Sequence, residues 1–575
     1  SLDAAPAKEI KKEDDEIELS FDFKKIKNLF KQQEKESSAS GDEINIDWSK
    51  TANFFKKYGV ILLVLIPVIL SVYVRMQAGF LLFTDDWAAN TVTNNLRSQI
   101  GSSINQQYPN LPDANKNEIV EREFQKFVSQ NKKQLEEQIR GTSAYFRSFF
   151  QDENGRNYMP DIDPYYWVRY TENVVDHGHP GDVLKDGRPY DDHQLAPIGR
   201  YVTGDMFHAY FWAYVYKVLH VFAPNLSVMR SMFYYPVFIS ALVVLLVFFI
   251  ARKITDNLGG FFASSMIAVN AAFLGRTLFG HADNDVWVVF FPLLITWLFI
   301  LTEETKNIVK ILVITLLGGF FTGIFTFAWT GWWYIFDFLL ASIGLTLLYL
   351  ILINFKTIVK NPKSLISNES TRNIIFIGFV YFISTALFVT LFSGWSTFRN
   401  SFLGPLSFPS IKQPVSGAAL WPNVLTTVAE LNEGSINNII SSVGGSFLFF
   451  VSLVGLILSV SKKDGMKKFD LIYTIGTAIF YGAYFLFRGG SIGSSVIPLI
   501  MWIMLPIIIR IGIAVYKKDT SYDFKLSILL SLWVSSTMFA SIKGIRFTLL
   551  LAPAFSVAFG VAIARIYSYT RNVLT

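Results

Sequence analysis

The chain has 575 residues, of which 51% are hydrophobic and only 17% are charged, which excludes an ordinary water-soluble protein and indicates a polytopic membrane protein. It contains no cysteine, which excludes a disulfide framework and a thiolate metal site. The formal net charge of +6 can be interpreted only after each charge is assigned to one side of the membrane. We expect no nucleic-acid partner.

The N-terminal region, 1–57, is polar and mixed in charge, which is typical of a mobile tail. Its segment 21–30 is a candidate for a short amphipathic helix on the membrane surface. Lysines crowd the second half of this tail, directly before the first apolar run, so the positive-inside rule predicts a cytoplasmic N-terminus. We therefore divide the chain into a tail, 1–57, and a transmembrane catalytic part, 58–575.

Twelve apolar segments approach the roughly 20 residues that a helix needs to cross a membrane. They predict an all-α polytopic membrane protein of about 12–13 transmembrane helices, with large outer loops at 75–230 and 394–442. The predicted crossings are 58–74, 228–251, 258–276, 286–303, 308–327, 331–353, 373–393, 443–461, 469–487, 493–514, 526–543 and 546–567.

The first outer loop contains two features besides its acidic motif. An insertion at 90–150 has apolar residues near helical spacing at 117–150, which predicts a helical subdomain. An aromatic run at 206–222 is expected to lie along the outer interface, because a crossing there would separate the acidic motifs on opposite sides of the membrane.

The acidic motifs share one side of the predicted membrane. With the N-terminus inside, segments rich in Lys and Arg fall on the cytoplasmic side and the outer loops are poorer in them, as the positive-inside rule requires. Asp161 and Asp163 follow the first crossing, Asp283 and Asp285 follow the third, and Glu430 follows the seventh. All three motifs are therefore predicted to lie outside, where they can converge on one cation and one phosphorylated donor.

The motifs carry a family resemblance through their order, spacing and common side. The first reads Asp161-Ile162-Asp163 with Pro164 and Arg169 following. The others occupy 177–182, 193–200, 276–285 and 427–430. Together they resemble the catalytic subunit of oligosaccharyltransferase, the membrane enzyme of asparagine-linked glycosylation, in its archaeal form. The resemblance extends from residue 58 to the end of the chain, apart from the insertion.

This resemblance implies a GT-C-like glycosyltransferase architecture in a multi-pass protein of an archaeal cell membrane, with the active site on the outer face. It implies metal-dependent, inverting transfer of a glycan from a polyprenyl (dolichyl) phosphate or diphosphate to the asparagine amide of an Asn-x-Ser/Thr acceptor. The expected partners are thus a lipid-linked oligosaccharide, an acceptor polypeptide and membrane lipid.

The resemblance also assigns roles to individual residues. It implies Mn2+ or Mg2+ at Asp163, Asp283, Asp285 and Glu430, with Asp161 in support, although the second motif is D-x-D here and more often D-x-E or D-x-H in the family. The remaining roles are catalysis by Asp163 and Glu430, donor-phosphate binding by Arg546, His193 and Trp332, and acceptor binding by Thr427 and Glu430.

These residue types suit such chemistry. A hard cation held by carboxylate oxygens neutralises the charge that develops on a phosphate leaving group, and an all-oxygen donor set favours Mg2+ or Mn2+ over zinc. The asparagine amide is a poor nucleophile, because its nitrogen lone pair is delocalised. Two carboxylates that accept its N–H groups could orient the nitrogen and reduce that delocalisation.

Each motif also has an ordinary structural interpretation. An Asp-Pro pair is common in turns, Asp283 and Asp285 could cap a helix, and Arg546 could extend to the membrane interface. Asp85 and Asp86 form a rival first motif, but no Pro-aromatic-Arg pattern follows them.

Three other functions stay open. Another lipid-linked-sugar-dependent transferase, such as a protein O-mannosyltransferase, is the nearest alternative; a transporter and an inactive scaffold subunit are the others. The W-W-D-Y-G signature that recognises the acceptor in the family is absent from the chain. We therefore expect a C-terminal globular domain, reached through one more crossing, in the full-length protein.

Overall fold

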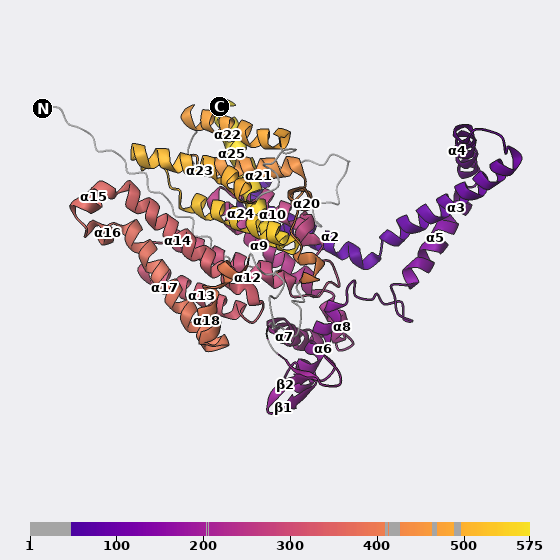
Figure 1. Cartoon of the computed structure of the whole chain (residues 1–575), viewed down its shortest axis with the longest axis horizontal. Coiled ribbons are helices and arrows are strands. Elements are labelled where there is room, and N and C mark those ends of the chain that lie inside the picture. Colours follow the sequence, from indigo (N-terminus) through magenta and orange to yellow (C-terminus); the bar gives the residue numbers. More distant parts are fainter. Residues whose placement is uncertain are drawn as a thin grey trace, which may run out of the picture. The chain divides into compact units, whose positions relative to one another are not determined.

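The structure, a computed structural model, describes residues 48–202, 204, 206–408, 412, 426–462, 468–487 and 496–574. Contacts divide the chain after Gly59, and the second unit, Val60–Thr575, is the one described below. Helices dominate this unit, with a small sheet in the first loop (Figure 1). The predicted helix at 21–30 lies outside the described residues.

Nine stretches of the described chain are long and apolar enough to cross a membrane, which confirms an all-α polytopic membrane protein. They are Tyr58–Phe80 (α2, Trp48–Met76, with η1, Gln77–Phe80), Val228–Ile254 (α8, Val228–Met232, and α9, Tyr235–Ile254), Asp285–Glu304 (α12), Ile308–Phe325 (α13), Thr330–Ile353 (η2, Thr330–Trp332, and α14, Trp333–Ile353), Glu369–Ser393 (α17), Ile497–Lys517 (within α23, Val496–Lys517), Lys525–Lys543 (α24) and Ile545–Asn572 (η7, Ile545–Phe547, and α25, Thr548–Leu574).

The other three predicted crossings are also helical, but two of them are short. The prediction of one continuous crossing over 258–276 is wrong: α10 (Asn257–Val269) ends at Asn270, whose side chain instead caps α11 (Ala271–Leu274). The predicted crossing 443–461 corresponds to α21 (Ser446–Ser459), which α20 (Ile436–Ser442) meets at 88°. The last of the three, α22 (Lys468–Phe487), has 20 residues.

The core is built around α25, which is 89% buried over its apolar window. It packs against α10, α21, α24 and α9. Small residues permit this close approach, because a Cβ atom built at Gly455 of α21 would overlap the carbonyl oxygen of Ala558 on α25. Arg546 lies in the turn directly before α25, so a helix that its neighbours largely enclose positions that side chain.

The inserted region forms three helices rather than one. The stretch predicted at 117–150 is interrupted at Asn131, and its halves are α4 (Asp113–Gln130) and α5 (Lys132–Ser148). A preceding helix, α3 (Phe83–Gln107), was not predicted, since its apolar residues show almost no periodicity. Helices α3 and α5 pack side by side (Figure 1).

The rest of the first loop carries its acidic motif. Asp163 begins α6 (Asp163–His177), which is followed by the antiparallel strands β1 (Val183–Lys185), β2 (Arg188–Asp191) and β3 (Arg200–Tyr201). The aromatic run 206–222 forms α7 (Phe207–Phe222), a 16-residue helix that is not among the nine membrane-crossing stretches. One face of α7 packs on α6.

The remaining elements are short. They are α15 (Phe355–Lys360) and α16 (Ser364–Ser367), and, in the later outer loop, α18 (Trp395–Ser401), α19 (Gly404–Ser407) and η5 (Ala429–Leu431), where Glu430 lies.

The contact between α21 and α25 predicts a specific instability. Gly455→Ala should lower the free energy of unfolding by about 1–3 kcal/mol, because the new methyl group has no room beside Ala558. Gly476→Ala is the matched control, since a Cβ atom there meets no atom within 4 Å. Thermal unfolding in detergent should separate the two variants; equal unfolding temperatures would contradict the packing described here.

Candidate functional site

The second acidic motif is held by backbone hydrogen bonds on both sides. The Phe279 amide donates to the carbonyl of Arg75 at 3.2 Å, and the Gly280 amide donates to that of Phe233 at 3.0 Å. Gly280 has a left-handed φ of +88°, and a Cβ atom there would collide with the Phe233 ring, so only glycine fits this turn. The turn directs the next residues into the protein at the start of α12.

The motif gathers three groups that can bind a metal ion. His281, Asp283 and Asp285 each offer one ligand atom, and these atoms lie within 4.8 Å of one another. Burial raises the pKa of the Asp283 carboxyl, and the adjacent Asp285 raises it further. Two carboxylates held this close and out of water favour a positive partner.

Two arginines join this motif to the later outer loop. The Asp285 Oδ1 atom lies 2.8 Å from Arg546 Nη2, and its Oδ2 atom lies 3.6 Å from Arg276 Nη1. Arg276 also pairs closely with Glu430, and Arg546 Nη1 lies 3.7 Å from Glu430 Oε2. Asp285 is almost fully buried, whereas Glu430 and both arginines are partly exposed. A ligand can therefore contact Glu430 and the two arginines while the Asp285 carboxylate remains buried.

The position of Glu430 follows from the packing of its neighbours. The Gly434 amide donates to the carbonyl of Ile542 at 2.9 Å, and the Ile545 amide donates to that of Asn432 at 3.0 Å. The adjacent Leu431 is buried in a small apolar cluster with Val288, Phe547 and Leu550. These contacts fasten the loop to the start of α12, the end of α24 and the start of α25, and so bring Glu430 beside Arg546.

Helix α6 connects the first motif to the second. Trp167, one turn after Asp163, donates its Nε1–H to Asp283 Oδ1 at 2.9 Å. Its ring centroid lies 5.0 Å from that of His208, whose pKa burial lowers to about 3. Asp163 itself is exposed at the start of the helix, and its carboxylate makes no hydrogen bond or ion pair with another described residue. It is thus free to accept a ligand.

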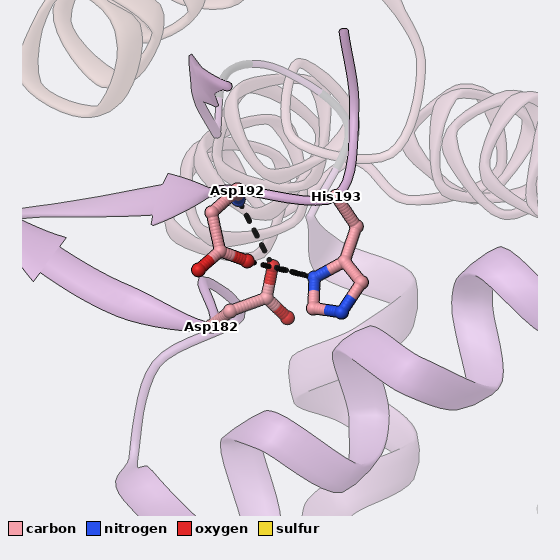
Figure 2. A group of neighbouring side chains, drawn as sticks. All are labelled: Asp182, Asp192 and His193. Carbon is pink, nitrogen blue, oxygen red and sulfur yellow. Dashed lines mark hydrogen bonds and ion pairs between the residues drawn. The ribbon is translucent and has the colours of Figure 1, made fainter. Parts of the chain in front are cut away.

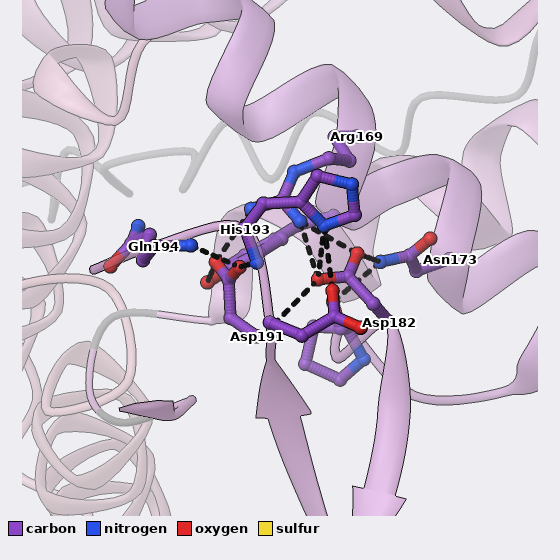
Figure 3. A network of polar contacts seen from close by, with 9 residues as sticks. Arg169, Asn173, Asp182, Asp191, His193 and Gln194 are labelled. Carbon is purple, nitrogen blue, oxygen red and sulfur yellow. Dashed lines mark hydrogen bonds and ion pairs between the residues drawn. The ribbon is translucent and has the colours of Figure 1, made fainter. Parts of the chain in front are cut away.

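A second polar network holds the small sheet onto α6. Figure 3 shows Asp182 and Asp191 converging on Arg169, at 2.6 and 2.5 Å. Burial opposes ionisation of Asp182, but hydrogen bonds from Asn173 and Arg169 hold the pKa of that carboxyl well below its usual range. Donor groups of the protein itself, from Arg169 and Asn173, thus already bind the carboxylates of Asp182 and Asp191.

His193 belongs to this second network. Figure 2 shows its ring beside Asp182 and Asp192, at 3.1 and 2.7 Å, and the hydrogen bond to Asp182 raises the pKa of His193. The three residues form another group with metal-ligand spacing. Because Arg169 already neutralises Asp182, we interpret the group as a structural ion-pair cluster.

The predicted site residues thus fall into two sets. The structure joins Asp285, Glu430 and Arg546 directly, with Asp283 adjacent to Asp285. It leaves the others apart from that network. Asp161 is exposed and accepts the amide of Ile162, His193 lies in the second network, Trp332 is buried in the core, and Thr427 is exposed in the Glu430 loop.

Three contributors were not predicted as site residues. His281 lies inside the second motif and offers a nitrogen beside the oxygens of Asp283 and Asp285, where the sequence led us to expect oxygen ligands alone. Arg276 opens the motif at 276–285, and its bridge between Asp285 and Glu430 depends on residues far apart in sequence. Trp167 follows the D-x-D motif in a run of aromatic residues, where nothing marks its hydrogen bond to Asp283.

The residues present fit a divalent cation. Asp285 Oδ2 is buried without a hydrogen-bond donor among the described residues, beside Asp283 and His281. When ionised, the carboxylates that the structure brings together outnumber its guanidinium groups by one: Asp283, Asp285 and Glu430 against Arg276 and Arg546. A histidine in the donor group admits several divalent metals and does not by itself select one.

Comparison with known proteins gives a consistent result. The family model described as "Oligosaccharyl transferase STT3, N-terminal" matches residues 133–571. The chain is 28% identical to the dolichyl-phosphooligosaccharide-protein glycotransferase of Methanococcus voltae, over 75% of this chain and 44% of that protein. It is 22% identical to the protein of the same name from Methanocaldococcus jannaschii, over 75% and 48%. The chain spans about half the length of these curated relatives.

Solved structures of an archaeal protein are also similar to this chain. One is the oligosaccharyltransferase AglB from Archaeoglobus fulgidus in complex with an inhibitory peptide and a dolichol-phosphate, at 14% identity over 72% of this chain and 47% of that one, with a TM-score of 0.41. Another is the Archaeoglobus fulgidus enzyme in complex with Zn and sulfate, at 16% identity over 71% and 46%, with a TM-score of 0.42.

The hydrogen bond from Trp167 to Asp283 can be tested by metal binding. Trp167→Phe keeps the ring packing but removes the N–H donor, so Asp283 loses its orientation and Mn2+ binding should weaken about tenfold. Free Mn2+ measured by electron paramagnetic resonance gives the affinity without an activity assay. Trp395→Phe, at an exposed tryptophan of α18, should bind Mn2+ like the parent protein. Unchanged affinity in Trp167→Phe would show that this bond does not position a metal ligand.

Proposed function

Because the chain belongs to the oligosaccharyl transferase STT3 family, we propose that it is the membrane catalytic part of an oligosaccharyltransferase. It would transfer a glycan from a dolichyl phosphate or diphosphate to the asparagine amide of an Asn-x-Ser/Thr acceptor. The observation that carries this proposal is the ion-pair network of Asp285, Arg546, Arg276 and Glu430, which joins three segments distant in sequence. The similar proteins of Methanococcus voltae and Methanocaldococcus jannaschii are named dolichyl-phosphooligosaccharide-protein glycotransferases, which supports the same donor class.

Arg546 is the strongest candidate for the donor phosphate. Its guanidinium group is partly exposed and is held from behind by the buried Asp285. A guanidinium fixed in this way presents its remaining N–H groups to phosphate oxygens in a fork geometry. Arg276 supplies a second positive charge on the other side of Glu430. Of the other predicted phosphate contacts, His193 is engaged by carboxylates and Trp332 is buried, so we give them no role in the proposed site.

His281, Asp283 and Asp285 would hold a divalent cation, Mn2+ or Mg2+, with Asp163 contributing from α6. Such a cation supplies Lewis-acid stabilisation of the charge on a departing phosphate. Trp167 keeps Asp283 oriented, and the arginines keep Asp285 and Glu430 in place. Fixed charges of this kind need no reorganisation during the reaction.

Asp163 and Glu430 are proposed to bind the acceptor amide. Each carboxylate would accept one N–H of the asparagine side chain, with Thr427 in the same loop as a further contact. A bond would form between the amide nitrogen and the anomeric carbon as the bond to the phosphate oxygen breaks. The bonding electrons would leave with the lipid phosphate, and one amide proton would pass to the carboxylate that accepts it. Attack opposite the leaving group inverts the anomeric centre.

Recognition of the hydroxyl residue of the acceptor is assigned to a C-terminal globular domain of the full-length protein. We place the site on the outer face of an archaeal cell membrane and the N-terminus in the cytoplasm, as the distribution of Lys and Arg predicts.

Peptide glycosylation tests this assignment. The full-length protein, assayed with an Asn-x-Thr peptide and native lipid extract, should transfer glycan with Mn2+ and lose activity on chelation. Asp163→Ala and Glu430→Gln should each lower the rate by about 100-fold or more, because the first removes the carboxylate and the second removes its charge and replaces one acceptor oxygen with an NH2 donor. Glu153→Gln, at an exposed turn shortly before Asp163, should leave the rate unchanged. Normal transfer by both site variants would refute the proposed site.

A further inference from the structure

A continuous apolar surface covers the base of the α3–α5 hairpin. Its side chains come from the end of the first membrane-crossing stretch, from the turn after it and from the facing ends of α3 and α5. Each is 44–62% exposed, which is unusual for residues of this size. We call this surface the aromatic collar; it consists of Phe80, Leu82, Phe83, Trp87, Tyr145 and Phe149.

Ring contacts join Trp87, Tyr145 and Phe149 through Phe146, and join Phe83 to Phe150. The rings of Trp87 and Phe146 stack with centroids 4.0 Å apart, and those of Tyr145 and Phe149 meet edge to face at 4.8 Å. Rings fixed in this way hold their outer faces in a constant position. The exposed apolar area is therefore a stable feature of the hairpin base.

The collar is continuous with a lipid-facing helix. The stretch Tyr58–Phe80 crosses the membrane with only 17% of its apolar window buried inside the protein, so most of its side chains face lipid. Phe80 is the last residue of that stretch, and α3 begins at Phe83. Trp87 lies one turn further, about 6 Å along the helix at 1.5 Å per residue. The collar therefore lies within the thickness of the headgroup layer.

Charges near the collar indicate its depth. Asp85 lies between its aromatic residues but bonds to Ser143 and, at 3.1 Å, to Arg147, so its charge is paired. Asp86 is exposed beside Trp87. A free carboxylate at this level suits the headgroup region and not the hydrocarbon core.

The far part of the hairpin has the opposite character. Its surface carries exposed ion pairs, including Arg97 with Glu121 and Lys132 with Glu136. Such pairs are stable in water and costly to bury. The change from an aromatic base to a charged tip fixes the direction of the hairpin relative to the membrane surface.

We propose that the aromatic collar is an interfacial membrane anchor, which embeds the base of the α3–α5 hairpin among lipid headgroups and leaves the charged end in water. Tyr and Trp are favoured at this depth because their rings combine an apolar body with a polar edge. The occupant of the surface is membrane lipid. The anchor is independent of the catalytic assignment, since none of its residues belongs to the acidic site.

The absence of cysteine allows a direct test. Tyr145→Cys in this 575-residue chain, carrying a nitroxide label and reconstituted in lipid nanodiscs, should be more accessible to oxygen than to a water-soluble nickel chelate. Ser129→Cys, an exposed position near the junction of α4 and α5, should show the reverse. The two sites are separated by most of α5, about 20 Å along the helix, so the contrast should be large.

A second label position shows whether the accessibility measured at Tyr145 holds for the rest of the collar. Phe149→Cys, one turn beyond Tyr145, should report the same lipid exposure. A preference for the nickel chelate at both collar sites would overturn the proposal. Dipolar broadening that vanishes on dilution with unlabelled protein would also overturn it, because the surface would then contact a second copy of the chain.

Discussion

The site depends on the pairing of opposite charges where membrane helices end. Asp285 is almost fully buried at the start of α12, and an unpaired carboxylate there would be strongly unfavourable. Arg546 and Arg276 remove that penalty, and the same two guanidinium groups reach Glu430. One electrostatic requirement of the fold thus assembles the side chains that the proposed chemistry uses. A buried ion pair gives little net stability, but removing one partner leaves a charge that the site cannot solvate.

Helix packing supplies the precision of this arrangement. Arg546 precedes α25, which is enclosed by neighbouring helices, and at Gly455 the backbones of α21 and α25 are too close for a side chain to fit between them. Asp163, in contrast, lies on an exposed loop helix whose position depends on Trp167 and on the Arg169 network. Side-chain contacts of α6 thus hold Asp163 in position, whereas helix packing and backbone hydrogen bonds hold Arg546 and Glu430.

Much of the fold could be predicted from the sequence, because apolar length and the distribution of Lys and Arg are local signals. The common grouping of Asp285, Glu430 and Arg546 was also predicted, through the family resemblance of their motifs. The end of α10 at Asn270 was not predicted, since a single asparagine in an apolar run does not indicate that its side chain will cap a new helix. His281 and Trp167 were missed for a different reason: their roles exist only through contacts with residues that folding brings close.

The backbone pairing of 432–434 with 542–545 has a mechanical consequence. It makes the Glu430 segment and the Arg546 turn a single rigid body, so a carboxylate assigned to the acceptor and a guanidinium assigned to the donor cannot shift independently. To make more room for a peptide, the loop must either break the two backbone hydrogen bonds of 432–434 with 542–545 or bend at another position. Loading of one substrate is thereby sterically linked to the geometry that receives the other.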